Sequence, residues 1–314
     1  MPTPYSTHVY EEVTSTQDVA RELSEFGPVL VVASRQTAGR GRSGAAWETA
    51  PRALAMSLRF DPFEWPSDRR TLIPLATGIA VARLWDLALK WPNDLLLPLR
   101  REEKIVFLPS EGGVPERSKG GGGRVSPPGG GSTRALRGGG GRSIDARRVV
   151  SFPAQSKEEH PHRAIENAPL PASPALPPPG GETEDKVGGI LAEASGREVT
   201  IGIGLNLWWL DPPADRIGLF PEDPGPSAYT AIASELAESV WAELAKGPER
   251  WSYDEYCNSC ATLGRKITWG DGHSGTALAI DRFDGALIVE DANGDRLNLK
   301  AGEIRHVRAS PDPR

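Results

Sequence analysis

The sequence predicts a mixed α/β domain followed by a small antiparallel β-barrel, and three patterns support this fold class. Residues 1–97 alternate short apolar runs with longer segments of helical periodicity. Residues 188–209 hold two apolar runs on either side of a short turn, as in a hairpin. From residue 266 onward, glycine-containing turns separate short strands, which is typical of a compact barrel of about fifty residues.

Three strands and two helices are expected in the first part of the chain. The strand sequences are "HVYEEV", "PVLVVA" and "ALAMSLRF", at residues 8–13, 28–33 and 53–60. Residues 71–85, "TLIPLATGIAVARLW", have the apolar density of a buried helix.

The helix expected at residues 15–26 has clear boundary signals. Ser15 or Thr16 is the expected N-cap, because a hydroxyl oxygen can accept a hydrogen bond from the free N–H groups of the first turn. Gly27-Pro28 is the expected stop. The residues that share one apolar face are Ala20, Leu23 and Phe26.

The second part of the chain contains a hairpin, a helix and the barrel. The runs "GGILAEA" and "VTIGIGLNLWW" pair about a turn at residues 195–198, and an amphipathic helix is expected at residues 231–247. Asp284-Gly285 and Asn293-Gly294 are hairpin signals, because such pairs adopt the positive φ angles that tight turns need. The expected barrel strands are "KITWG", "SGTALAIDRFDG", "ALIVEDANGD" and "RLNLKAGEIRHV".

A low-complexity segment interrupts the main domain at residues 98–185. Glycine and proline make up about a third of it and Phe107 and Phe152 are its only aromatic residues, so we expect disorder. A solvated insert is the favoured interpretation. The alternatives are a loose nucleic-acid contact through its "GGGGR" repeats and a reading-frame artefact. The expected boundaries are 1–97 with 186–262 for the main domain, 98–185 for the insert and 263–309 for the barrel.

Charge and hydropathy exclude several classes of partner. The 314 residues carry a formal net charge of −6, with a pI of about 5.5, so the whole chain has no electrostatic reason to bind nucleic acid or an anionic membrane. The amino terminus has no basic region followed by an apolar run, and no apolar run approaches the ~20 residues of a membrane span. We therefore expect a cytoplasmic protein.

The two cysteines, Cys257 and Cys260, form a lone C-x-x-C pair at the end of a helical stretch. A zinc site would need two more ligands at matching spacing, and a thioredoxin-like motif would need a βαβ setting. The favoured interpretation is a pair of plain buried thiols.

A glycine- and arginine-rich loop, "SRQTAGRGRSGAAW" at residues 34–47, follows the second strand. Its backbone N–H groups can close around an anion, and the guanidinium groups of Arg40 and Arg42 can bind carboxylate or phosphate in a bidentate manner. Taken alone, the loop is more simply explained as an ordinary surface loop.

Three further motifs strengthen the case for an anion site. In "LKWPNDLLL", Trp91-Pro92 is expected to hold the chain extended, and Asn93 and Asp94 offer oxygens for a metal or for hydrogen bonds, although an ordinary turn is the alternative. In "KVGGILAE", Lys186 precedes a glycine pair and a buried strand. Asn206 ends the partner strand in "IGIGLN".

Taken together and in this order, these motifs resemble the biotin protein ligase family, the biotin–[acetyl-CoA-carboxylase] ligases. The resemblance covers nearly all of the chain outside residues 98–185. It implies an α+β fold, with a mixed β-sheet flanked by helices of the class II synthetase-like, biotin/lipoate ligase type and an SH3-like barrel at the carboxyl end. No winged-helix DNA-binding domain precedes "HVYEEV", so the short form of the family is expected. The matching pieces are "STQ", "RQTAGRGRSGAAW", "KWPNDLLL", "KVGGILAE", "IGIGLN" and "LGRKI...GTALAID...GALIVE...AGEIRHVR".

The resemblance also implies an activity. The family activates biotin with MgATP to biotinyl-5'-AMP and then passes biotin to one lysine of a biotin carboxyl carrier domain of a carboxylase. The expected substrates are therefore ATP and biotin, the cofactor is Mg²⁺, and the carrier domain is the protein partner. No specific nucleic acid and no membrane are expected as partners, and a homodimer is one expectation for the assembly.

Individual residues receive roles by motif match, and these stay implications of the resemblance. Arg40, Arg42 and Lys186 would supply positive charge, and Asp94 would orient or deprotonate the incoming lysine. The loop from Gly39 to Gly44 would close over the intermediate, with Trp47 against the adenine. The expected biotin-binding residues are Ser15, Thr16, Gln17, Gln36, Gly39, Arg40, Arg42, Lys186 and Gly189. The expected ATP-binding residues are Arg42, Gly44, Trp47, Lys90, Asn93 and Asn206, with Mg²⁺ near Asn93 and Asp94.

The chain departs from the family pattern in places, and other functions compete. Ala45 stands where the family commonly has a basic residue, and residues 98–185 replace a short hairpin turn. A lipoate ligase would share the fold and the adenylation chemistry. A non-catalytic biotin or nucleotide sensor, or an RNA-binding protein using the insert and barrel, is the alternative from another class. The intact charge set favours catalysis.

Overall fold

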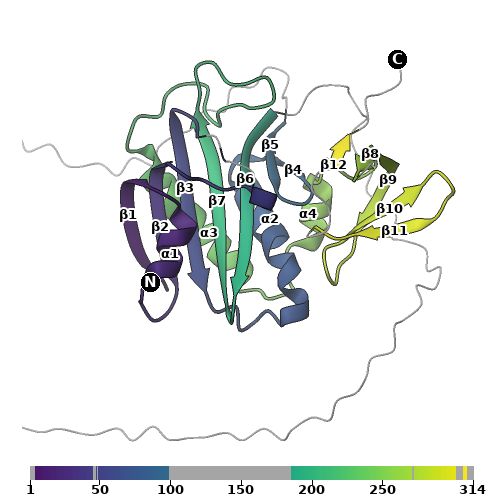
Figure 1. Ribbon diagram of the computed structural model, residues 1–314, viewed down its shortest axis with the longest axis horizontal. Coiled ribbons are helices and arrows are strands. Elements are labelled where there is room, and N and C mark those ends of the chain that lie inside the picture. Colours follow the sequence, from purple (N-terminus) through teal and green to yellow (C-terminus); the bar gives the residue numbers. More distant parts are fainter. Residues whose placement is uncertain are drawn as a thin grey trace, which may run out of the picture. The chain divides into compact units, whose positions relative to one another are not determined.

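The computed structural model describes residues 4–44, 47, 49–98, 185–270 and 272–301, and the backbone of 307–309 (Figure 1). The chain divides into two compact units, and all of the described residues belong to the unit formed by residues 1–105 and 173–314. The prediction of a disordered insert at residues 98–185 lies outside the described residues, apart from its two ends.

A seven-stranded mixed sheet forms the body of this unit (Figure 1). Its strand order is β1-β2-β3-β7-β6-β5-β4, in which β1 and β2 are parallel and the other neighbours are antiparallel. This confirms the expected mixed sheet. The strands are β1 (Ser6–Val13), β2 (Val29–Gln36), β3 (Arg52–Phe60), β4 (Ala88–Lys90), β5 (Asp94–Leu97), β6 (Asp185–Ser195) and β7 (Glu198–Trp208).

Helices cover both faces of the sheet (Figure 1). On one face, α2 (Ile73–Trp85) and α3 (Ala228–Leu244) pack against the apolar side chains of β3, β6 and β7 and build the main core. On the other face, α1 (Thr16–Glu22) packs against β2 and β3 in a smaller cluster formed by Ala20, Val29 and Val31. Strand β3 is buried on both faces for this reason. The remaining helical elements are the 3₁₀ turns η1 (Arg42–Gly44) and η2 (Ser67–Leu72) and the short helix α4 (Tyr253–Ser259).

The first helix begins where the sequence predicts but ends earlier. Ser15 is the N-cap, and its hydroxyl accepts a hydrogen bond from Asp18 N at 3.5 Å. The helix stops at Glu22, and the expectation that Phe26 lies on its apolar face is wrong, since that side chain is fully exposed. The reason is tertiary: the Arg59 guanidinium donates to the carbonyl oxygens of Leu23 and Glu25, at 2.6 and 2.8 Å, and holds this segment in a non-helical path.

The hairpin and the later helix agree with the sequence. Strands β6 and β7 pair from Gly188↔Leu205 to Ser195↔Glu198, and Gly196 takes a positive φ of 60° in the turn between them. Helix α3 starts at Ala228, three residues before the expected position.

A five-stranded antiparallel sheet follows, in the order β11-β10-β9-β8-β12. Gly285 and Gly294 have positive φ angles of 73° and 86°, which confirms both predicted hairpin turns. This sheet fits the expected SH3-like barrel. Its strands are β8 (Lys266–Trp269), β9 (His273–Ile280), β10 (Leu287–Asp291), β11 (Arg296–Leu299) and β12 (Val307–Ala309).

The Trp91-Pro92 pair does not hold the chain extended, so that expectation is wrong. Residues 91–93 form the turn between β4 and β5, and the Trp91-Pro92 peptide bond is cis. Trp91 is buried; its backbone N–H donates to Thr262 Oγ1 at 3.0 Å and its indole N–H donates to Gly285 O at 3.0 Å. These bonds fix the turn from which Asn93 and Asp94 project.

Both cysteines are free thiols, as expected. Cys260 is buried, and burial raises its pKa. Cys257 is partly buried, and burial is the main cause that raises its pKa to about 11. Within the described part of the chain, no helix is long and apolar enough to cross a membrane.

Candidate functional site

The floor of the candidate site is a strip of glycines on β6 and β7. Gly189 and Gly204 are register partners in these two central strands. A Cβ atom added at Gly204 would lie 2.9 Å from Trp47 Cζ2, and one added at Gly189 would lie 3.2 Å from Trp47 Cζ3. The Trp47 ring therefore rests directly on the backbone of the sheet, which only glycine allows at such close approach.

Lys186 and Asp94 meet beside this ring. The ammonium nitrogen of Lys186 lies 2.6 Å from Asp94 Oδ1 and 5.5 Å from the centroid of the Trp47 ring. Strand pairing explains the approach, because β5 and β6 are neighbours and Lys186 is opposite Leu96, two residues from Asp94 on β5. The motifs "KWPND" and "KVGG", which the sequence separates by about ninety residues, thus supply one ion pair.

Arg42 joins this cluster from the glycine-rich loop. Its guanidinium donates to Asn93 Oδ1 at 3.4 Å and to the carbonyl oxygen of Ala301, which follows β11. Burial lowers the pKa of Arg42, while the nearby Asp94 charge raises it; an arginine still stays protonated at neutral pH. Arg42, Lys186 and Asp94 together carry one net positive charge, which suits an anion.

Asn93 is held by the backbone of β6. Its side-chain amide donates to Ile190 O at 3.0 Å, and its own carbonyl accepts from Ile190 N at 2.9 Å. The oxygen that faces Arg42 is therefore fixed in direction.

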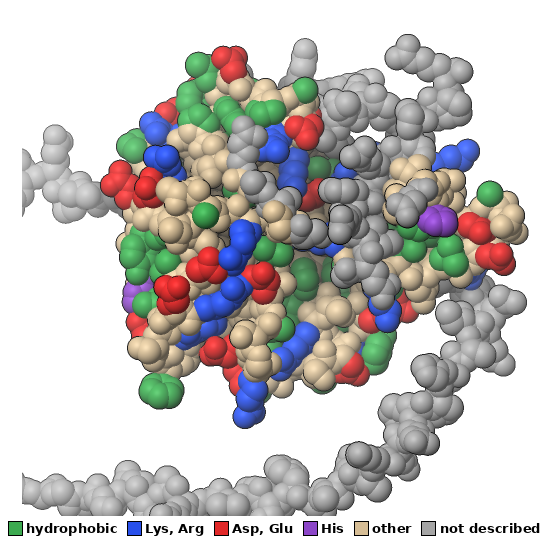
Figure 2. Space-filling model, in the orientation of Figure 1, with side chains coloured by type: hydrophobic (Ala, Val, Ile, Leu, Met, Phe, Trp, Pro, Cys, Tyr) green, Lys and Arg blue, Asp and Glu red, His purple; other side chains and the backbone are tan. Residues whose placement is uncertain are grey.

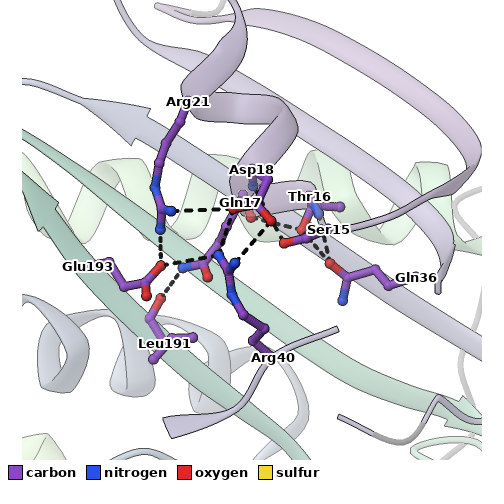
Figure 3. A network of polar contacts seen from close by, with 10 residues as sticks. Ser15, Thr16, Gln17, Asp18, Arg21, Gln36, Arg40, Leu191 and Glu193 are labelled. Carbon is purple, nitrogen blue, oxygen red and sulfur yellow. Dashed lines mark hydrogen bonds and ion pairs between the residues drawn. The ribbon is translucent and has the colours of Figure 1, made fainter. Parts of the chain in front are cut away.

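A second group of polar residues lies where α1 begins (Figure 3). Ser15, Thr16 and Gln17 are all buried. The Thr16 backbone N–H and hydroxyl donate to Gln36 Oε1 at 2.8 and 3.1 Å, and Ser57 Oγ donates to Thr16 Oγ1 at 2.8 Å. The predicted biotin-binding residues Ser15, Thr16, Gln17 and Gln36 are thus brought together in space.

Gln17 and Gly39 connect this group with the glycine strip. The Gln17 amide donates to Leu191 O on β6 at 2.9 Å and lies over Gly202, where an added Cβ would be 3.1 Å from it. A Cβ at Gly39 would lie 3.0 Å from Gln36 Nε2 and 3.2 Å from Trp47 Cβ. The loop therefore passes close to both groups.

Arg40 is not a free cation in this arrangement. Its guanidinium donates to both Asp18 oxygens, at 3.0 and 2.7 Å, and lies 3.7 Å from Glu193 (Figure 3). Arg21 contacts the same two carboxylates. Basic and acidic side chains interleave on the face of the molecule shown in Figure 2. Sequence reasoning missed Asp18, Arg21 and Glu193; an Asp and an Arg three apart on a helix was the only signal available.

Asn206, a predicted ATP-binding residue, has a side-chain oxygen that accepts no hydrogen bond from the described residues. It is only 2% exposed, and among the described residues its Oδ1 atom has no hydrogen-bond partner. A buried acceptor without a partner is costly, so a partner from a ligand would satisfy it. Of the other predicted residues, Lys90 is opposite Asp94 in the β4–β5 pairing and Gly44 has a positive φ of 75°, while Ala45 lies outside the described residues.

The described residues do not form a metal site by themselves. They include no group of three or more His, Cys, Asp or Glu side chains placed to hold a metal ion. The Asp94 carboxylate is paired with Lys186. Magnesium in proteins is commonly bound by one or two carboxylates together with substrate phosphates, so Asp94 fits such an ion only as a partial ligand.

Sequence and structure comparisons extend this description. The sequence model of the "Biotin/lipoate A/B protein ligase family" matches residues 10–122. The bifunctional ligase/repressors BirA of Bacillus spizizenii and Bacillus subtilis are each 35% identical over 100 residues. These matches cover 28% of this chain and 30% of each relative. The chain therefore aligns with less than a third of these curated relatives.

Solved structures are similar over nearly the whole chain. A biotin protein ligase from Aquifex aeolicus in complex with biotin and ATP has a TM-score of 0.57 at 18% identity, with 97% of this chain and 99% of that chain covered. A biotin acetyl coenzyme A carboxylase synthetase from Helicobacter pylori has a TM-score of 0.50 at 16% identity, with 93% and 99% covered. The fold is thus that of the biotin protein ligases. Over residues 10–122 the sequence is similar to the biotin/lipoate A/B protein ligase family.

Proposed function

We propose that the chain is a biotin protein ligase, which activates biotin with ATP to biotinyl-5'-AMP and transfers biotin to a lysine of a carrier domain. The observation that carries this proposal is the meeting of Lys186, Asp94 and Arg42 beside the Trp47 ring. The buried polar group at the start of α1 lies across the same face of the sheet.

The first step brings two anions together. A carboxylate oxygen of biotin forms a bond to the α-phosphorus of ATP, the bond from that phosphorus to the bridging oxygen breaks, and pyrophosphate leaves. Such a step needs positive charge and positioning rather than a side-chain nucleophile. Arg42 and Lys186 would provide the charge. The Lys186 ammonium has three donors, so it can keep Asp94 and also contact a phosphate oxygen.

The second step transfers the acyl group. The lysine amine of the carrier attacks the carbonyl carbon of the mixed anhydride, AMP leaves, and the amine loses a proton. Asp94 is the proposed group that orients this amine or accepts its proton, since its second carboxylate oxygen is not the one that Lys186 contacts.

The two substrates would divide the site. Ser15, Thr16, Gln17 and Gln36 would bind the ureido and thiophene head of biotin, with Gly39 and Gly189 close to its chain. The adenine would meet Trp47 and the unpartnered acceptor of Asn206. Gly44, Lys90 and Asn93 would lie near the phosphates, and Mg²⁺ would arrive with those phosphates and neutralise part of their charge.

The acceptor and the location are part of the proposal. We propose the biotin carboxyl carrier domain of an acetyl-CoA carboxylase as the acceptor, and the cytoplasm as the site of action. Support for the acceptor comes from a structural neighbour that is a biotin acetyl coenzyme A carboxylase synthetase.

Biotin-dependent exchange of radiolabelled pyrophosphate into ATP tests the first step. We expect exchange with biotin and none with lipoate, followed by labelling of a purified carrier domain. Exchange that responds to lipoate would favour lipoate ligation. Nucleic-acid binding with no exchange for either acid would favour a non-catalytic function.

A further inference from the structure

Arg40 is one of four charged side chains that form a cluster between α1 and β6 (Figure 3). The Asp18 carboxylate accepts two hydrogen bonds from Arg40, at 2.7 and 3.0 Å. Arg21 lies 3.4 Å from Asp18 and also pairs with Glu193. Two arginines and two carboxylates carry no net charge, so this cluster attracts an anion much less than the cluster around Lys186 does.

Asp18 lies in the same helical turn as the proposed head-group residues. It directly follows Gln17 in the chain, and its backbone N–H donates to Ser15 Oγ. Thr16 in this turn binds Gln36, the last residue of β2. The loop that carries Arg40 starts at the next residue, where Thr37 N donates to Val13 O at 2.9 Å and Ala38 N donates to Thr14 O at 2.8 Å. The start of the loop is therefore bonded to the residues that lead into α1, and Arg40 bonds the loop to the first turn of α1 itself.

We propose that Asp18 is a positioning residue: through the Arg40 guanidinium it fixes residues 37–44 to the first turn of α1, so that a ligand bound on that turn stabilises the loop. The main function of Arg40 is then to anchor the loop rather than to bind an anionic group of the substrate. This inference rests on the proposed function, and it assigns a task to Asp18, which no motif indicated.

The two possible functions of Arg40 predict opposite effects when Asp18 loses its charge. If Arg40 anchors the loop, Asp18→Asn weakens the anchor and biotin binding suffers. If Arg40 binds the substrate's carboxylate or phosphate, Asp18→Asn frees the guanidinium from a competing carboxylate, and binding stays the same or improves.

Steady-state pyrophosphate exchange with Asp18→Asn, Arg40→Gln and the double variant separates these cases. We expect each single variant to raise the KM for biotin about three- to tenfold with kcat within about twofold, because the bonds lost act in binding. The double variant should be no worse than Arg40→Gln alone, since the two residues act as a pair. Asp18→Glu should restore part of the loss.

A matched control exists on another part of the surface. Asp223 accepts from Arg52 Nε at 3.0 and 3.2 Å, and the side-chain exposures of that pair, 34% and 36%, are close to the 34% and 38% of Asp18 and Arg40. Asp223→Asn should leave the KM for biotin unchanged. An unchanged or lowered KM in Asp18→Asn, or losses that add in the double variant, would overturn the proposal.

Hydrogen exchange of the backbone amides gives a readout that does not need catalysis. Both single variants should speed exchange in residues 37–44 while the strands of the sheet keep their protection. If the wild-type chain catalyses no biotin-dependent pyrophosphate exchange, the proposed ligase function is wrong. The amide hydrogen exchange then tests by itself whether Asp18 and Arg40 anchor the loop. Unchanged protection of residues 37–44 in Asp18→Asn would refute the anchor.

Discussion

The two faces of strand β7 differ residue by residue. Ile201, Ile203 and Leu205 point into the core beneath α2 and α3 and are at most 2% exposed. The alternate residues Gly202 and Gly204 present bare backbone to Gln17 and Trp47. One strand thus supplies core packing through one face and the floor of the candidate site through the other. Because successive side chains of a strand point to opposite faces, each property can be changed separately.

The largest effect is expected on the site face, from Lys186→Ala. Loss of one preorganised positive charge should lower the rate of biotinyl-AMP formation by on the order of 10²–10³, while the melting temperature stays close to that of the wild type. Quenched-flow measurement of biotinyl-AMP would show this. Lys266→Ala, which removes an exposed lysine from β8, is the control. Near-normal formation of the intermediate by Lys186→Ala would remove Lys186 from the proposed mechanism.

The opposite result is expected on the core face, from Ile203→Ala. Removing this buried side chain should lower the free energy of unfolding by about 2–4 kcal/mol, through lost burial and the cavity that remains. Urea denaturation measures the loss. The KM values for biotin and ATP, taken well below the melting temperature, should stay within about twofold of wild type. A large rise in either KM with no loss of stability would mean that the two faces are not separable.

A smaller effect on the site face is expected from Gly204→Ala. The new methyl group would lie 2.9 Å from Trp47 Cζ2, so the ring must move away from the strand. We expect the KM for ATP to rise about tenfold, because a displacement of this size misplaces a binding group. Gly78→Ala in α2 is the control, since its methyl group would meet Leu89 Cδ2 at an ordinary 3.4 Å. Equal kinetics for both variants would show that the position of the Trp47 ring is unimportant.

The smallest effect is expected away from both faces, at Cys257. Burial raises its pKa from an ordinary 9.0 to about 11, so the thiolate appears only as the pH rises toward that value. At pH 8 the thiolate fraction is roughly a hundredfold below that of a thiol with the ordinary pKa, and alkylation should be correspondingly slow. Iodoacetamide labelling followed by mass spectrometry measures this. Rapid labelling at pH 8 that abolishes pyrophosphate exchange would contradict the interpretation of Cys257 as an inert thiol.

Local sequence patterns determined most of the secondary structure. The hairpin of β6 and β7, the N-cap at Ser15 and the turns at Gly285 and Gly294 follow from periodicity and from side chains that favour caps and turns. Motif order was sufficient to indicate the fold and to select residues that this fold then brings together, Lys186 and Asp94 among them. Such features depend on the chain's immediate neighbours, so they can be predicted from the sequence.

Only the tertiary structure decided which hydrogen-bond and ion-pair partners the long arginine side chains have. Arg59 ends α1 at Glu22 by binding carbonyl oxygens of the following segment, although the apolar periodicity of that segment continues. Arg40 pairs with Asp18 and approaches Glu193, which is remote in the sequence. A flexible arginine can reach several acceptors, and the choice depends on which strands and helices become neighbours. That information is distributed over the whole fold and is absent from any single motif.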